Sequence, residues 1–303
     1  MRVYGLDFTS APDAANSEAQ KKKRLMLAVC KLEKDVLYLE EMCLLNRTAG
    51  SFSGFEEWLG GSGAFEAREN KWIAGIDFPF GQPAKLVSEL KWPDTWSGYV
   101  QHVKRMRKGA FEKELERFKQ RKPDGEKHLF REIDRLTHSQ SPMTLSGTPV
   151  GKMFYEGAYR LCDADVCVVP VRPKESTRVV VEAYPALVAR KWIGLKQGYK
   201  KDDPTKDDEC KKYARCDIVS AIRGKDKNNC RKSLKEWYGF TVEMTDECAK
   251  DCVDDFTGDT LDSVLSAVQA AWASRHGSNY GVPANVNLLE GWICDPETAK
   301  NED

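Results

Sequence analysis

The sequence has no long apolar run and no excess of charge of either sign. No run approaches the ~18–20 residues that a membrane-spanning helix needs, and the first residues show no signal-peptide core. Lysine plus arginine and aspartate plus glutamate both number 47, so the formal net charge is zero. A polycation that binds nucleic acid through bulk charge is therefore excluded, and any such contact needs a local patch. These absences predict a globular, cytoplasmic protein with no membrane partner.

Histidine and closely spaced cysteines are also scarce. Only 4 histidines occur in 303 residues, and none lies in an H-E-x-x-H or H-x-H arrangement. The 10 cysteines include no C-x-x-C pair, so free thiols are expected in place of a disulfide framework or a structural zinc site. A metal site in this chain is expected to use oxygen ligands.

The apolar runs that are present predict an α/β fold. The sequence predicts a single domain whose core covers about 1–82, 176–195 and 256–296, with two helical insertions over about 83–175 and 196–255. Short apolar runs bounded by turn residues predict strands, and apolar residues at helical spacing predict helices. Strands are expected over residues 3–8, 24–30, 36–42, 72–78 and 178–184, and helices over 53–59, 185–192 and from 258 onward.

Carboxylates stand at the ends of these predicted elements, although aspartate is depleted in strands. Asp7 and Asp77 end apolar runs, Glu182 lies within another, and Asp259 and Asp262 share one face of the last predicted helix. Each alone has an ordinary explanation, as a turn cap, an outward-facing strand residue or a helix N-cap. Several carboxylates at one place repel one another unless a cation neutralises them. Oxygen ligands of this kind favour a hard ion such as Mg²⁺ or Mn²⁺.

Five short motifs follow one another in the order 5–12, 75–81, 147–157, 181–185 and 259–267. Their order resembles the ribonuclease-H-like (retroviral integrase) superfamily. The chain is more closely similar to the family catalogued as domain of unknown function 429, whose members are predicted ribonuclease-H-like nucleases. The resemblance implies a five-stranded mixed sheet in the order 3-2-1-4-5, flanked by helices.

The same resemblance implies a nuclease that hydrolyses phosphodiester bonds in a nucleic acid with one or two Mg²⁺ or Mn²⁺ ions. Asp7 would bridge two ions, with Asp77 and Asp262 each holding one. The resemblance thus implies Asp7, Asp77, Glu182 and Asp262 as catalytic residues, and Asp7, Asp77, Asp259 and Asp262 as metal ligands. The residues expected to bind substrate are Thr9, Ser10, Lys152 and Arg160.

Two alternatives stay open. A phosphotransferase of the actin and sugar-kinase type would use Thr9 and Ser10 near phosphate and Asp77 as base, but that superfamily needs a duplicated core. The other alternative is a non-catalytic protein that keeps the ribonuclease-H-like fold.

Phosphate-binding signals elsewhere in the chain are weak. The segment from Gly147 to Met153 is one residue short of a phosphate-binding loop and has methionine in place of the metal-binding hydroxyl. No nucleotide cofactor is therefore expected. Basic runs at 21–24 and 104–108 are candidate contacts to a nucleic-acid backbone.

Overall fold

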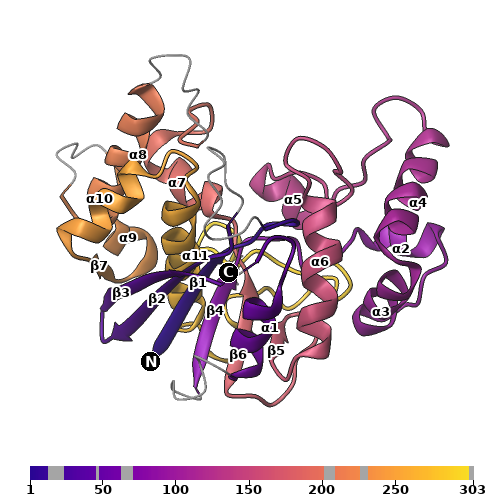
Figure 1. Ribbon diagram of the computed structural model, residues 1–303, viewed down its shortest axis with the longest axis horizontal. Helices are drawn as coiled ribbons and strands as arrows, with labels where there is room; N and C mark the ends of the chain where they lie inside the picture. The colour runs from indigo at the N-terminus through magenta and orange to yellow at the C-terminus, as the bar shows by residue number, and fades with distance from the viewer. Residues whose placement is uncertain (13–23, 46–47, 63–70, 201–208, 226–230, 300–303) are drawn as a thin grey trace.

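The computed structural model describes residues 1–12, 24–45, 48–62, 71–200, 209–225 and 231–299. Its centre is an open mixed sheet of seven strands with helices on both faces (Figure 1). The α/β class predicted from the apolar runs is confirmed. Within the described ranges, no helix combines the length and the apolarity that crossing a bilayer requires.

The five predicted strands form the middle of the sheet, in the order β3-β2-β1-β4-β6. β1 pairs antiparallel with β2, which pairs antiparallel with β3, whereas β1–β4 and β4–β6 are parallel. Each of these strands is long enough to contain a short apolar run. Their bounds are β1 Arg2–Asp7, β2 Met26–Glu33, β3 Val36–Leu44, β4 Trp72–Ile76 and β6 Arg178–Glu182.

The prediction of a five-stranded sheet is wrong, because each of the two segments predicted as helical insertions adds a strand at an edge. β5 (Cys167–Val169) pairs parallel with β6, and β7 (Thr241–Glu243) pairs parallel with β3. The full order is β5-β6-β4-β1-β2-β3-β7. Strands of three residues are too short for the alternation that identifies a strand in a sequence.

The helices divide between the two faces of the sheet (Figure 1). On one face, Val3, Ile73 and Val181 pack with the helices α7, α8, α9, α10 and α11. On the other face, Leu6 and Val180 pack with α1, α3, α4 and α6. The bounds on the first face are α7 Pro185–Ile193, α8 Glu209–Ile222, α9 Leu234–Tyr238, α10 Asp246–Asp254 and α11 Asp259–Ala273. The bounds of the helices on the second face are α1 Ser53–Gly60, α3 Trp96–Met106, α4 Lys108–Gln120 and α6 Val150–Asp163. The remaining short helices are α2 Ala84–Glu89, α5 Glu132–Thr137 and the 3-10 helix η2 Gly277–Asn279.

Helix α11 lies directly on β1 and β4 because both strands carry a glycine at the contact. Gly5 and Gly75 are partners in the parallel register of these strands. A Cβ at Gly5 would lie 2.0 Å from the carbonyl oxygen of Ser263, and a Cβ at Gly75 would lie 2.3 Å from that of Ser266. Both obstacles are backbone atoms of α11, so a larger residue would displace the helix. The two glycines therefore fix the position of the helix over the sheet.

Candidate metal centre

Asp7 and Asp77 reach the same place because β1 and β4 carry the same short pattern, glycine, an aliphatic residue and aspartate. Side chains two residues apart on a strand point to the same face, so each aspartate lies on the face covered by α11. The backbone N–H of Asp77 donates to the carbonyl of Leu6 at 3.0 Å, which extends the parallel ladder to the aspartates. The first turn of α11 adds Asp262 from above.

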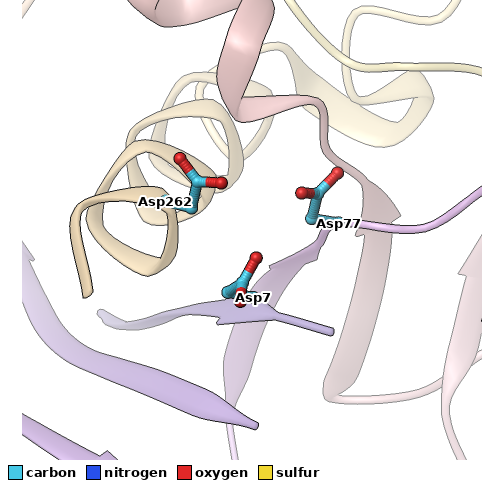
Figure 2. Close-up of side chains that lie close together, drawn as sticks. All are labelled: Asp7, Asp77 and Asp262. Atoms are coloured by element: carbon cyan, nitrogen blue, oxygen red, sulfur yellow. The ribbon is translucent and has the colours of Figure 1, made fainter. Parts of the chain in front are cut away.

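The carboxylates of Asp7, Asp77 and Asp262 turn toward one another (Figure 2). One oxygen from each lies within 4.8 Å of the other two. Asp262 is fully buried and Asp7 is 8% exposed, whereas Asp77 is partly exposed. The structure thus brings together three of the four residues predicted as metal ligands, from three different elements.

The environment of this cluster disfavours negative charge. Burial, with the charges of Asp259 and Asp77, raises the pKa of Asp7 well above its ordinary value. Burial, together with Glu182, raises the pKa of Asp77 to about 6. Lys200 opposes both shifts. A bound cation would remove the penalty that keeps these pKa values high.

Two neighbours of Asp262 were not predicted from the sequence. The Tyr199 hydroxyl donates to Oδ1 of Asp262 at 2.7 Å, and the Lys200 ammonium forms an ion pair with Oδ2. Both residues lie in a lysine-rich stretch that gives no sign of an ordered site. Three carboxylates and one ammonium leave two negative charges unbalanced when all are ionised. One divalent cation would neutralise that deficit.

The donor set fits a hard divalent ion such as Mg²⁺ or Mn²⁺. All three side chains offer carboxylate oxygens, which are the ligands that these ions prefer. Within the described part of the chain, the buried Oδ2 of Asp262 accepts no hydrogen bond and is approached by the Lys200 ammonium alone. This oxygen is already ion-paired with Lys200, so an ion bound there would compete with the ammonium for it. The three aspartates are the residues that would hold an ion, and the binding of one ion or of two stays a prediction.

Asp259, the fourth predicted ligand, lies outside the three-aspartate cluster. Its carboxylate is paired with the guanidinium of Arg24 at 3.3 Å, and the same guanidinium pairs with Asp255. Asp255 in turn accepts hydrogen bonds from the Thr260 backbone and hydroxyl at the start of α11. Asp259 is close enough to Asp7 to raise its pKa. Asp259 therefore acts on the cluster through its charge, and its own carboxylate is paired with Arg24.

Glu182 lies outside the three-aspartate cluster, although it lines the same cavity as Asp77 and raises the pKa of Asp77. Val181 faces α11, so the alternation of the strand turns Glu182 to the opposite face. There Arg131 binds both carboxylate oxygens, at 2.7 and 2.9 Å, and the backbone N–H of Phe80 donates to one of them. Burial raises the pKa of Glu182, although Arg131 opposes the shift. A catalytic role for Glu182 stays a prediction, with its acceptor sites already engaged.

Of the four residues predicted to bind substrate, Thr9 and Ser10 directly follow β1. The Ser10 carbonyl accepts from Lys108 Nζ at 3.3 Å. Lys152 and Arg160 lie on α6, where both are paired with acids: Lys152 with Glu112 at 3.7 Å, and Arg160 with Glu56 and Glu156 at 2.8 and 3.0 Å. Their role in binding phosphate stays a prediction.

In both basic runs, at least one of the described side chains is paired with an acidic residue. In the run at 104–108, Lys104 pairs with Asp163 and Lys108 with Glu156, each at 2.7 Å. In the run at 21–24, residues 21–23 lie outside the described residues, and Arg24 is engaged behind Asp7. Neither run presents all its charges to a partner.

Comparisons of the chain with protein-family models, with curated proteins and with solved structures give no match.

Proposed function

We propose that the protein is a divalent-metal-dependent nuclease that hydrolyses phosphodiester bonds in nucleic acid, on a ribonuclease-H-like core. The observation that carries the proposal is the convergence of Asp7, Asp77 and Asp262, with carboxylate oxygens within 4.8 Å of one another. The order of the five central strands, β3-β2-β1-β4-β6, also supports it, because it matches the 3-2-1-4-5 order that the resemblance implies, within a sheet that has one further strand at each edge. The described residues form a single sheet, which offers no support for the duplicated core of a sugar kinase.

In this proposal the three aspartates hold the ion. A divalent ion in such a site activates water and neutralises charge on the phosphate. Asp7 and Asp262 are held rigidly by β1 and α11, and the Tyr199 hydroxyl orients the carboxylate of Asp262. Asp77 is partly exposed and forms the edge that substrate approaches. Lys200 pairs with Asp262 and lines the cavity beside Asp77, so its ammonium is placed to meet a phosphate at that edge.

The direct test compares cleavage of labelled single-stranded, duplex and hybrid nucleic acids in Mn²⁺ by the wild type and by Asp7→Asn. We expect the substitution to lower the rate by more than the roughly 10–100-fold that loss of an outer-shell residue costs a metal site. Asp94→Asn is the matched control, since Asp94 is an exposed acid outside the cluster. Cleavage that survives Asp7→Asn would assign the activity to another site or to a contaminant. A wild type that neither cleaves nor binds metal would rule out the proposal.

A further inference from the structure

A cavity of about 350 Å³ opens beside the three-aspartate cluster. Asp77 and Lys200 both line it, so the cavity and the cluster share an edge. Its other walls come from α7, from the start of α6, from the segment before Lys200, and from a polar side that includes Gln140 and the Arg131–Glu182 ion pair. A larger cavity of about 660 Å³ lies around Trp272, which is ten residues and about 15 Å along α11 from Asp262. Only the smaller of these two cavities adjoins the proposed site of chemistry.

The walls of the smaller cavity combine apolar surface with fixed planar groups. Met153, Ala186 and Ile193 supply apolar surface. The guanidinium of Arg190 lies 5.2 Å from the centre of the Tyr184 ring. It also donates to the Tyr184 hydroxyl at 2.9 Å and to a backbone carbonyl at 2.7 Å, so both planes are held in place. Nucleobases stack on aromatic rings and on guanidinium planes of this kind.

We propose that this cavity receives the base of one unpaired nucleotide, while Lys200 contacts the adjoining phosphate. The inference rests on the proposed nuclease function and names its substrate class: nucleic acid with a single-stranded end or an unpaired nucleotide. The volume lies at the lower end of the roughly 300–1,000 Å³ of ligand pockets, so one base fits and a duplex does not. A base that stays paired and stacked cannot enter, because entry requires it to leave the stack.

The test fills the cavity and measures binding in place of cleavage. Ala186 lies in the first turn of α7 and lines the cavity, so Ala186→Trp places an indole where the base would go. Ala284→Trp is the matched control, because Ala284 is an exposed residue that lines the larger cavity. Fluorescence anisotropy gives Kd for a labelled single-stranded oligonucleotide and for the blunt duplex of the same sequence. Both are measured in Ca²⁺, with the probe checked on a gel for integrity.

We expect Ala186→Trp to weaken single-strand binding by about tenfold or more, within the roughly 5- to 150-fold that one base–aromatic stack contributes. Duplex binding should not change, and Ala284→Trp should change neither. Tyr184→Ala should weaken single-strand binding in the same way, while Tyr184→Phe, which keeps the ring, should retain most of it. This second pair keeps the test decisive if thermal unfolding shows that Ala186→Trp does not fold.

Normal single-strand binding by Ala186→Trp and Tyr184→Ala would overturn the cavity's role, as would an equal loss on single strand and duplex. If the wild type cleaves nucleic acid in that case, the nuclease proposal survives without the cavity. If the variants behave as expected but no metal-dependent cleavage is found, the nuclease proposal fails and the nucleotide-binding cavity remains. If the wild type binds neither the single strand nor the duplex, both the cavity proposal and the nuclease proposal are overturned.

Discussion

Replacing Lys200 tests whether its ammonium is the cation that balances the aspartates when no metal is bound. The Lys200 side chain is 33% exposed and its partner Asp262 is fully buried, so solvent screens the pair only in part. Exposed ion pairs contribute up to about 1 kcal/mol, and breaking a fully buried pair costs about 3–5 kcal/mol. Tyr199 would still donate to Asp262 after the substitution. We therefore place the stabilisation by Lys200 at about 1–2 kcal/mol.

Lys200→Ala should lower the stability of the metal-free protein and raise the affinity of the protein for the metal ion. Without metal, the free energy of unfolding should fall by that amount, which lowers Tm by about 2–3 °C in a chain of this size. Metal binding should become tighter by about 5- to 30-fold, because the ion no longer has to displace the ammonium. Because Lys200 and the ion compete for Asp262, the free energy of unfolding lost by the metal-free protein should equal the free energy gained in metal binding.

Thermal unfolding in EDTA and calorimetric titration with Mn²⁺ at pH 8 measure the two effects. Lys212→Ala is the control, because Lys212 forms a 2.8 Å ion pair with Asp254 in which both side chains are largely exposed. We expect that control to change neither quantity by more than the error of the measurement. Weaker Mn²⁺ binding by Lys200→Ala, or unchanged stability without metal, would refute the role assigned to Lys200.

Three further predictions concern packing, pH and the buried ion pair. Gly5→Ala should cost about 3 kcal/mol of unfolding free energy and weaken Mn²⁺ binding, because the added Cβ meets α11 backbone at 2.0 Å. Gly109→Ala is the control: its Cβ meets nothing within 4 Å, so it should cost nothing in the same melts. The pKa of Asp77 is raised to about 6 in the folded protein, so folding takes up a proton between about pH 4 and 6. The stability that this group contributes to the metal-free protein is therefore present below about pH 4 and is lost as the pH rises through 6, while Mn²⁺ affinity falls as the pH drops below 6. Both trends should be weaker in melts and titrations of Asp77→Asn, although the raised pKa of Asp7 keeps part of each. Arg131→Met should cost about 3–5 kcal/mol in chemical denaturation, because it leaves two buried carboxylates without their partner; a loss under 1 kcal/mol would contradict that account.

The centre of the sheet was predictable from the sequence, and its edges were not. The five central strands each contain a short apolar run, and such runs are a strong local signal of a buried strand. β7 consists of Thr241, Val242 and Glu243, which carry no such signal and pair with a strand some 200 residues earlier in the chain. β5 lies in a short apolar run that was assigned to a helical insertion because helical spacing dominates the residues before it. Three-residue strands are defined by the neighbour they join and not by their own sequence.

The candidate site was predictable to the same extent. Asp7 ends β1 and Asp77 follows β4, two parallel strands whose carboxyl ends meet at one edge of the sheet, and Asp262 lies in the first turn of a helix. Glu182 was included for its place in the chain order, but the alternation of β6 carries it to the other face. Tyr199 lies 63 residues from Asp262, and a pairing over that distance leaves no periodic trace in a sequence. Lys200 was missed for the same reason.

Anomalous diffraction from a crystal soaked in Mn²⁺ tests the central claim most directly. The account predicts a peak about 2.1 Å from carboxylate oxygens of Asp7, Asp77 and Asp262, with the Lys200 ammonium moved off Asp262. A map with Mn²⁺ peaks elsewhere and none among the three aspartates, with Lys200 still paired to Asp262, would contradict it.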